Sequence, residues 1–296
     1  MKQLVMLSGK GGTGKTSITA SFAHLAYANS VRAVLADADV DAANMELVLS
    51  PHILEEHEFI GGKAARIVVE KCVNCGLCKQ VCRFDAIFEH EGKYKVDPIA
   101  CDGCAACVHQ CPTNAIIMEP QLAGQWYHSE SRYGQLFHAA LRPAQENSGK
   151  LVTLVKQQAR LLAMDENYPL IIVDGPPGIG CPVISAVSGA DLALIITEPT
   201  VAGVHDMERA LQMTQHFNIP STVCINKSDI FPEGTNHIRT YCLEQKIEVL
   251  GQIPFDTNVT EAMVHGEPVT AYRPESPASK EINRLWQTLV NIIQAD

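Results

Sequence analysis

Short apolar runs alternate with stretches of helical periodicity along most of this chain. Nearly continuous apolar runs, typical of strands buried on both faces, recur at residues 2–7, 31–37, 169–174, 192–197 and 222–226, and another strand ends at 251–256. Helical periodicity recurs at residues 16–28, 150–164, 203–216 and 279–295. Alternating strands and helices predict an α/β fold with a mostly parallel, doubly wound sheet and right-handed crossovers.

The pattern changes between residues 60 and 119. This region holds few large apolar side chains, but it holds eight of the chain's eleven cysteines. We therefore expect an α/β domain formed by residues 1–59 and 120–296, with a small α+β domain inserted at 60–119. The chain returns to the larger domain through an aromatic, histidine-bearing segment that starts at Gln121, and a loop is expected at 143–149. A chain of 296 residues is long enough to form both domains.

The first strand and the first helix are joined by SGKGGTGKTS, which runs from Ser8 to Ser17. The spacing Gly-x4-Gly-Lys-Thr fits the Walker A phosphate-binding loop, in which glycines let backbone N–H groups surround a triphosphate. In such a loop Lys15 reaches the β- and γ-phosphates and the Thr16 hydroxyl ligates Mg²⁺. The expected nucleotide-binding residues here are Gly9, Lys10, Gly11, Gly12, Thr13, Gly14, Lys15, Thr16 and Ser17.

A second lysine, Lys10, gives this loop the form KGGTGKT. This form resembles the deviant Walker A loop of the MinD/ParA/Mrp group of P-loop ATPases, which also includes the nitrogenase iron protein. The resemblance implies a dimer that forms on ATP, either a homodimer or a heterodimer of paralogues. It also implies that Lys10 crosses that dimer to the partner's phosphates, so that Lys10 and Lys15 are both catalytic.

Acidic residues end two of the predicted strands at the edge that holds the phosphate loop. The string Asp-Ala-Asp-Val-Asp covers residues 37–41, and strand ends at this edge hold the chemistry of doubly wound folds. The family resemblance implies that Asp39 orients the attacking water, with Asp41 as the alternative. Asp174 takes the Walker B place and would hold Mg²⁺ through water, and the segment 175–180 is expected to be a flexible second switch.

The identity of the base is less direct. Residues 226–229 read Asn-Lys-Ser-Asp, which matches the guanine-reading box of many GTPases. The resembled family instead uses this strand end to bind adenine through the asparagine, which is Asn226 here, and it places a proline, here Pro254, against the base. We therefore expect ATP with Mg²⁺ rather than GTP.

The inserted region contains two cysteine runs with the same spacing. Each reads Cys-x2-Cys-x2-Cys-x3-Cys, and every cysteine of the second run lies 29 residues after its counterpart. Ala86-Ile87 recurs as Ala115-Ile116 at the same offset. This internal repeat resembles a bacterial two-cluster ferredoxin, in which the fourth cysteine of each run ligates the other cluster.

The resemblance implies two 4Fe-4S clusters. One would be held by Cys72, Cys75, Cys78 and Cys111, and the other by Cys101, Cys104, Cys107 and Cys82. Structural zinc is the competing interpretation, because zinc sites also use Cys-x2-Cys pairs. One departure from the ferredoxin pattern is Arg83, where a proline usually follows the fourth cysteine, and a cation there favours the reduced state of a nearby cluster.

Several other residues invite a functional interpretation. Cys181 lies at the offset from Asp174 where the nitrogenase iron protein has a ligating cysteine, but there is no second cysteine between Cys111 and Cys181, so we expect a small buried thiol. His128 and His138 are expected to be packed or surface histidines. Cys224 and Cys242 are isolated in the sequence and have no ligand spacing.

Charge and hydropathy exclude several kinds of partner. The net charge of −10 and the lack of a basic run argue against a nucleic-acid partner. No apolar stretch is long enough to cross a membrane and the N-terminus lacks a signal-peptide pattern, so we expect a cytoplasmic protein without stable membrane insertion. The last helix has one apolar face and little positive charge opposite it, so core packing is expected rather than lipid binding.

Together these features predict an ATP-binding and ATP-hydrolysing iron–sulfur protein. It would dimerise on ATP and couple its nucleotide state to electron transfer with a redox partner that the sequence does not identify. Two alternatives stay open. One is an iron–sulfur cluster carrier of the Mrp type, and the other is a positioning switch of the MinD type with structural clusters.

Overall fold

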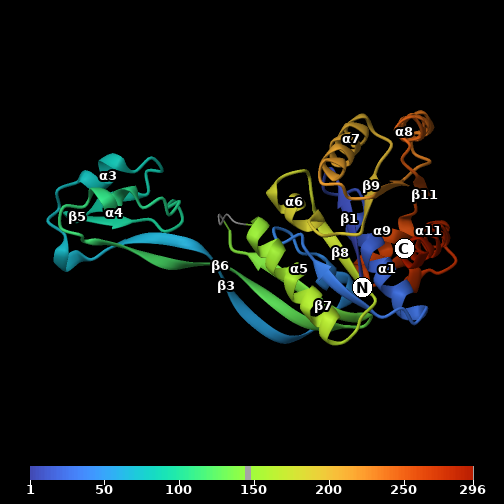
Figure 1. The fold of residues 1–296 in the computed structure, drawn as a ribbon, viewed down its shortest axis with the longest axis horizontal. Helices are drawn as coiled ribbons and strands as arrows, with labels where there is room; N and C mark the ends of the chain where they lie inside the picture. The colour runs from blue at the N-terminus through green and yellow to red at the C-terminus, as the bar shows by residue number, and fades with distance from the viewer. Residues whose placement is uncertain (144–147, 296) are drawn as a thin grey trace. The chain divides into compact units, whose positions relative to one another are not determined.

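The computed structural model describes residues 1–143 and 148–295, which form two compact units (Figure 1). Unit 1 comprises Met1–His57 and Trp126–Ala140 and resumes at Ser148. Unit 2 comprises Glu58–Gln125 and begins again at Leu141. Two long strands, β3 (His52–Ile67) and β6 (Ile116–Ser131), carry the chain from one unit to the other. Unit 2 is therefore a covalent insertion in the fold of unit 1.

Nine strands form one sheet in the order β11-β10-β9-β1-β8-β2-β7-β6-β3. The remaining bounds are β1 (Lys2–Ser8), β2 (Ala33–Asp37), β7 (Gly134–Leu141), β8 (Leu170–Pro177), β9 (Leu192–Thr197), β10 (Ser221–Asn226) and β11 (Val249–Ile253). All neighbouring pairs from β11 to β7 are parallel, which confirms the predicted mostly parallel sheet. Because β1, β2 and β8 are adjacent, their carboxyl ends meet at one edge.

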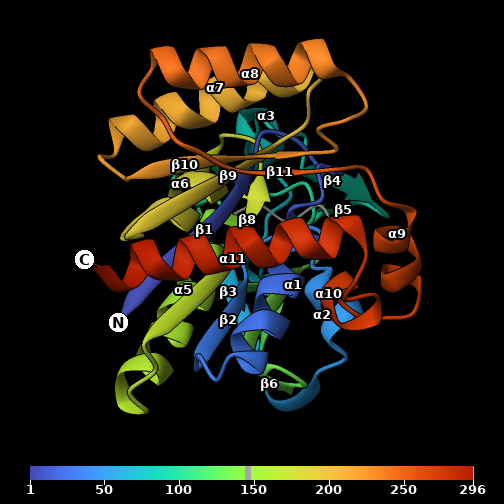
Figure 2. The same cartoon turned by 90° about the vertical axis from the view of Figure 1, so that its right-hand side faces the viewer.

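Helices cover both faces of this sheet (Figure 2). Their bounds are α1 (Lys15–Ala28), α2 (Met45–Leu49), α5 (Ser148–Asp165), α6 (Cys181–Val187), α7 (Val201–His216), α8 (Pro232–Glu244), α9 (Thr257–Val264), α10 (Val269–Tyr272) and α11 (Pro277–Ala295). Helices α1, α10 and α11 pack against one another on one face, and α5, α6 and α7 lie against β2, β8 and β9 on the other.

A single large core lies under α1 and α11. It includes Leu4 and Met6 of β1, and the rings of Phe22 and Trp286 meet there with centroids 5.3 Å apart. Trp286 and the residues on its side of α11 are buried, which confirms that the last helix packs onto the core. Among the described residues, no helix combines the length and apolar character that a membrane crossing requires.

Three parts of the fold differ from the sequence-based expectations. β8 continues to Pro177, so the first half of the expected flexible switch is strand. Gly175 permits this because it lies against β1, where a Cβ would be 2.7 Å from the carbonyl oxygen of Met6. Of the expected loop at 143–149, residues 144–147 lie outside the described residues, and Ser148 already starts α5. Strands β3, β6 and β7 were not expected.

Unit 2 is built from two matching halves. It contains the single turn η1 (Val69–Lys71), helices α3 (Leu77–Val81) and α4 (Ala106–Gln110), and the hairpin strands β4 (Ile87–His90) and β5 (Lys93–Val96). Helix α4 begins and ends 29 residues after α3. Positive φ angles recur at the same offset, in the pairs Asn74/Gly103, Gly76/Ala105 and Asp85/Asn114.

Two hydrogen bonds relate these halves reciprocally. The N–H of Val68 donates to the carbonyl of Ala115 at 2.7 Å, and the N–H of Asp97 donates to the carbonyl of Ala86 at 2.8 Å. Each residue of the second bond lies 29 positions from its counterpart in the first, forward for the donor and backward for the acceptor. Exchange of donor and acceptor between halves is what a pseudo-twofold arrangement produces, so the sequence repeat is also a structural repeat.

Candidate functional site

The predicted phosphate loop lies between β1 and α1, at the carboxyl edge of the sheet. Its φ angle is 80° at Gly12 and 91° at Gly14, a region that residues with a Cβ rarely adopt. A Cβ on Gly14 would also lie 2.3 Å from Nδ2 of Asn226. The loop borders a cavity of about 540 Å³ lined by Ser8, Lys10–Ser17, Asp39, Asp41, Ala42, Asn44, Pro176, Pro177, Pro182 and Met263.

Asp174 contacts both functional side chains of the loop. The hydroxyl of Thr16 donates to its Oδ2 at 2.7 Å, and Nζ of Lys15 lies 3.0 Å from its Oδ1. Thr19, one turn later in α1, also donates to Oδ1, at 2.8 Å. Asp174 is fully buried at the adjacent strand β8. The structure thus places the predicted Walker B carboxylate directly on the predicted magnesium-binding hydroxyl.

The loop also contains buried donors that lack protein acceptors. Within the described residues, Nζ of Lys15 and Oγ1 of Thr13 make no hydrogen bond of regular geometry, although both side chains are almost fully buried. Buried polar atoms ordinarily have hydrogen-bond partners. Phosphate oxygens would supply the missing acceptors, so these residues fit a nucleotide.

The acidic residues after β2 have two different roles in the structure. Asp37 is fully buried and accepts N–H bonds from Asp39, Asn44 and Met45, so its carboxylate holds the loop that leads into α2. Burial raises the pKa of Asp37, and the nearby Asp174 charge raises it further.

Asp39 faces the cavity instead. Its Oδ2 lies 4.0 Å from Nζ of Lys15. Burial, only partly offset by Lys15, raises the pKa of Asp39 to about 6. Asp41, the alternative candidate, lines the same cavity.

Lys10 also lines the cavity, but its ammonium group contacts its own chain. Nζ of Lys10 lies 3.2 Å from Oε2 of Glu198, the residue after β9. Lys227 binds Oε1 of the same carboxylate and the carbonyl of Gly12. Burial alone would raise the pKa of Glu198, but hydrogen bonds and positive charge from Lys227 and Lys10 outweigh burial and lower it.

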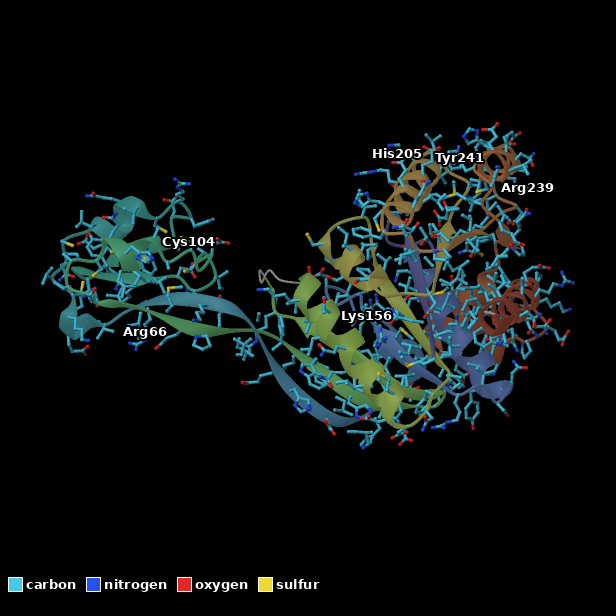
Figure 3. All side chains as sticks on the ribbon, viewed as in Figure 1. Arg66, Cys104, Lys156, His205, Arg239 and Tyr241 are labelled. Atoms are coloured by element: carbon cyan, nitrogen blue, oxygen red, sulfur yellow. The ribbon has the colours of Figure 1, made fainter. Side chains whose placement is uncertain are left out.

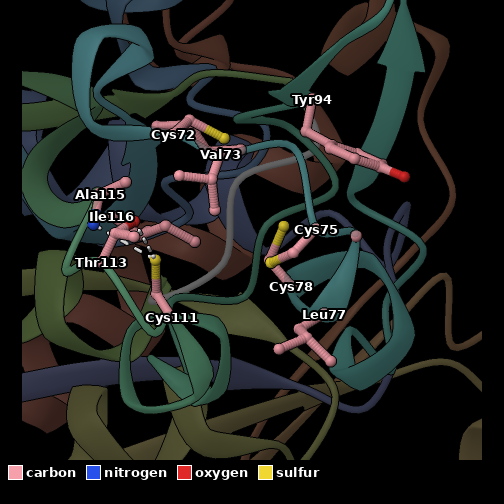
Figure 4. A pocket seen from close by; sticks show the side chains of 12 residues that line it. Cys72, Val73, Cys75, Leu77, Cys78, Tyr94, Cys111, Thr113, Ala115 and Ile116 are labelled. Carbon is pink, nitrogen blue, oxygen red and sulfur yellow. Dashed lines mark hydrogen bonds between the residues drawn. The ribbon is translucent and has the colours of Figure 1, made fainter.

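Four of the cysteines in unit 2 line one small enclosed cavity (Figure 4). They are Cys72, Cys75, Cys78 and Cys111, the set expected for the first cluster. The first three come from the loop before α3 and from α3 itself, and Cys111 follows α4. This grouping crosses between the two cysteine runs, as the two-cluster ferredoxin pattern requires.

The backbone supports the sulfur atoms of both sets. The N–H of Ala115 donates to Sγ of Cys111 at 3.2 Å, and the N–H of Ala65 donates to Sγ of Cys101 at 3.4 Å. Burial favours a higher pKa for Cys111, but N–H bonds from Ala115 and Thr113 outweigh it and lower the pKa. Cys78 and Cys107 are buried at matching positions, and burial raises the pKa of each.

The sulfur positions suit a cluster better than one ion. Among the described residues, no group of three His, Cys, Asp or Glu side chains is close enough to hold a single metal ion. In a 4Fe-4S cluster each thiolate binds a different iron, so the four sulfurs surround a cube rather than a point. A shared cavity with inward sulfur and backbone N–H donors is compatible with that donor set.

Residues 4–269 match the family described as the CobQ/CobB/MinD/ParA nucleotide binding domain. The chain belongs to this family. An uncharacterized protein of Methanocaldococcus jannaschii is 34% identical over 292 residues, which cover 98% of this chain and 97% of that protein. An iron-sulfur cluster carrier protein of Pyrococcus horikoshii is 29% identical over 157 residues, covering 48% of this chain and 52% of its own.

The fold of this MinD/ParA-type P-loop ATPase is similar to solved structures of the same family. The septum site-determining protein MinD of Pyrococcus horikoshii, complexed with Mg-ADP, superposes with a TM-score of 0.58 at 18% identity. The superposition covers 99% of this chain and 98% of that one. This likeness supports the α/β fold and concerns the fold alone.

The residues expected at the base are not part of the cavity. Asn226 and Pro254 do not line it, and both ends of the Asn226 amide are engaged, because Nδ2 donates to the carbonyl of Thr13 and Oδ1 accepts from the N–H of Lys227. Asp229, the residue that would read guanine, accepts the N–H of Phe255 at 2.6 Å. The preference for adenine stays a prediction.

Sequence reasoning missed one wall of the nucleotide cavity. Met263 of α9 lines the cavity, and its sulfur accepts from the Ser17 hydroxyl at 3.0 Å. Asn44 and Pro182 also line it. These residues belong to no motif and reach the loop only through the packing of elements that are distant in sequence.

The expectation for Cys181 is wrong. The side chain is exposed, because Cys181 is the first residue of α6 and lies at the sheet edge beside Pro182. Cys224 and Cys242 are buried, and burial raises their pKa values to about 12 and about 11. His138 is a packed histidine as expected, 3% exposed, with Nε2 2.9 Å from the hydroxyl of Ser129.

Proposed function

We propose that this protein is an ATPase that dimerises on ATP and couples its nucleotide state to electron transfer through two 4Fe-4S clusters. The observation that carries the proposal is the pairing of two sites in one chain. Unit 1 has a phosphate loop with its lysine and threonine on a buried aspartate, and unit 2 has four cysteines around one cavity. The proposed partners are a second subunit and an unidentified redox protein.

The proposed roles in unit 1 follow from the contacts. Thr16 and, through water, Asp174 would hold Mg²⁺, while backbone N–H groups of the loop and Lys15 would bind the phosphates. Asp39 lines the cavity beside Lys15, where it can orient a water molecule toward the terminal phosphate. Phosphoryl transfer requires positioning and charge placement, and these side chains supply both. Lys10 would supply further positive charge across the dimer.

The proposed roles in unit 2 follow from the grouping of the cysteines. Cys72, Cys75, Cys78 and Cys111 would hold one cluster, and the structural repeat assigns Cys101, Cys104, Cys107 and Cys82 to the other. The clusters would accept and release single electrons. The protein would set their potentials through N–H bonds to sulfur, solvent exposure and nearby charge.

The direct test is an anaerobic preparation in which iron, sulfide, zinc, EPR and ATP turnover are all measured. We expect about eight irons per chain and no zinc, because two complete sets of four thiolates are present. Cys75→Ser should lower the iron content toward about four and remove one EPR signal. Cys181→Ser is the matched control, because it changes an exposed cysteine outside unit 2 and should keep all the iron.

Other outcomes would favour different functions. A wild-type protein that saturates at four irons, or that binds zinc instead, would contradict the two-cluster proposal. The carrier function is the second candidate because part of this chain resembles an iron-sulfur cluster carrier protein. Against it, the three cysteines outside unit 2 are far apart in sequence. If Cys75→Ser left ATP turnover, dimerisation and their response to a reductant unchanged, the clusters would be structural, as in a positioning switch.

A further inference from the structure

Glu198 joins two lysines that come from different parts of the sheet edge. Its carboxylate lies 3.2 Å from Nζ of Lys10 in the phosphate loop and 2.5 Å from Nζ of Lys227 after β10. The Glu198 side chain is 10% exposed, and that of Lys10 is 39% exposed. Lys10 is thus the partner with access to solvent, while the carboxylate is set into the protein.

The backbone around Glu198 fixes that carboxylate. The carbonyl of Glu198 accepts the N–H of Thr200 at 2.8 Å, and Thr200 caps α7 by accepting the N–H of Gly203. A Cβ on Gly203 would lie 2.3 Å from the same carbonyl oxygen, so the first turn of α7 is packed tightly on this residue. On the other side, the carbonyl of Lys10 accepts from the Ser8 hydroxyl at 2.9 Å. A change of partner by Lys10 therefore requires movement of its side chain rather than of the backbone.

We propose that Glu198 is a positioning residue that holds Lys10 on its own chain and thereby sets how much ATP is needed for dimerisation. The inference rests on the proposed function, in which Lys10 binds phosphates bound by a second chain. One ammonium group cannot contact a carboxylate of its own chain and a phosphate across the dimer in the same arrangement. The Glu198 contact therefore competes with the dimer, and the fraction of chains with Lys10 released scales the apparent affinity of the dimer for ATP.

Lys227 controls the strength of this competition. It shares the carboxylate with Lys10, so part of the negative charge of Glu198 is already neutralised before Lys10 contributes. Removal of the Glu198 charge should release Lys10. Removal of the Lys227 charge should strengthen the hold on Lys10. These two changes have opposite expected signs, which a role in folding alone would not produce.

The test uses the full chain with its metal centres intact, Mg²⁺ and the slowly hydrolysed analogue AMP-PNP, with dimerisation followed by sedimentation velocity. In Glu198→Gln, which keeps the shape of the side chain, the half-maximal AMP-PNP concentration should fall about threefold, the size expected for a partly exposed ion pair. In Lys227→Met it should rise. Binding of a fluorescent ADP to each variant separates these effects from damage to the phosphate loop, and should stay within about twofold of wild type.

A second measurement does not depend on dimerisation. Acetylation of Lys10 by an amine-reactive ester, quantified by mass spectrometry without nucleotide, should be faster in Glu198→Gln, because the ammonium group is released from its ion pair. Acetylation of Lys2, whose ion pair is with Asp191, should not change and provides the internal reference. An unchanged acetylation rate of Lys10 would show that Glu198 does not hold it.

The failure of the inference and the failure of the proposed function give different results. If wild type does not dimerise with AMP-PNP, the proposed dimer is wrong and the role of Glu198 falls with it. If wild type dimerises while Glu198→Gln leaves the half-maximal concentration unchanged, only the role of Glu198 is wrong. A shift in the same direction for Glu198→Gln and Lys227→Met would assign both residues to the folding of the loop instead.

Discussion

At the scale of single residues, each cationic side chain of the phosphate loop contacts a carboxylate of its own chain. Lys15 meets Asp174 and Lys10 meets Glu198. A nucleotide bound in this loop would therefore exchange carboxylate contacts for phosphate contacts, and its net affinity is the difference between the two. The same competition explains how the charge of one side chain can control an assembly step.

Lys10 gives the sharpest test of catalysis. We expect Lys10→Ala to bind ATP but to hydrolyse it poorly, because positive charge supplied across a dimer to phosphoryl transfer is worth roughly 10³ to 10⁵ in rate. Steady-state turnover and nucleotide binding measured on the same preparation check this expectation. Lys2→Ala, at the other end of β1, is the control and should behave as wild type. Wild-type turnover in Lys10→Ala would mean that this lysine has no catalytic part.

His138 predicts a pH dependence of stability. Burial lowers its pKa to about 4, below the value of 6.5 for an unperturbed histidine. Between these values the unfolded chain binds the extra proton, so stability falls as the pH drops from 6.5 toward 4. Lowering the pH from about 7.5 to about 5.5 should cost about 1.4 kcal/mol through this residue, one unit of effective pKa difference.

The measurement is urea unfolding followed by tryptophan fluorescence, because Trp126 and Trp286 both lie in unit 1. His138→Gln should be less sensitive to acid than wild type by that amount. His205→Gln changes an exposed histidine and should keep the wild-type dependence. Equal acid sensitivity in His138→Gln and wild type would mean that this histidine does not contribute.

At the scale of elements, predictability follows the surroundings of each segment. The central strands could be predicted, since burial on both faces leaves nearly continuous apolar runs. β3 could not, because its first seven residues are exposed at the edge of the sheet and carry no apolar alternation. The site divides in the same way. Motif residues such as Thr16 and Asp174 could be assigned from spacing, whereas Glu198 and Met263 reach the site through tertiary packing.

Helix α6, which follows the β8 strand end, depends on a buried lysine of α5 (Figure 3). Nζ of Lys156 donates to the carbonyls of Ser185, Ala186 and Ser188 at 2.6–2.8 Å, where the carboxyl end of α6 has no further helical donors. Its side chain is buried, and burial, with a smaller contribution from the charge of Arg160, lowers its pKa to about 8.

Lys156→Met should therefore lower the free energy of unfolding by about 2 kcal/mol, because buried carbonyls lose their donor while the apolar volume is kept. It should also weaken nucleotide binding, since Pro182 in the first turn of α6 lines the cavity. Lys150→Met on the same helix is the matched control, because Lys150 is exposed. Unfolding by urea and binding of fluorescent ADP test both expectations, and unchanged values in Lys156→Met would contradict them.

At the scale of the whole molecule, the chain path joins the nucleotide site to the cysteine-bearing unit. Asp37 holds the N-terminal end of α2 through the N–H groups of Asn44 and Met45. After α2 the chain turns at Ser50, which has a φ of 47°, and enters β3, which continues into unit 2. Movement of the segment that carries Asp39 is thus passed along a short, hydrogen-bonded stretch to the strand that leaves unit 1.

We therefore predict that the nucleotide state changes the redox behaviour of unit 2. A ligand shifts a conformational equilibrium only by its different affinity for the two states, so the effect has a measurable size. If ATP changes the exposure of the cluster sulfurs or the N–H bonds to them, the midpoint potentials should move, because these factors set them. Asp39→Asn, which should bind ATP without hydrolysing it, is expected to keep the ATP-state potentials.

The decisive comparison is of potentials and reduction rates without nucleotide, with ADP and with ATP. Lys15→Ala is the control, because it should lose phosphate binding and with it any dependence on nucleotide. In wild type, a shift below roughly 18 mV is less than a twofold change for a one-electron couple. Shifts of that size with unchanged rates would mean that the strands joining the two units transmit no signal, and that binding and electron transfer are independent properties of one chain.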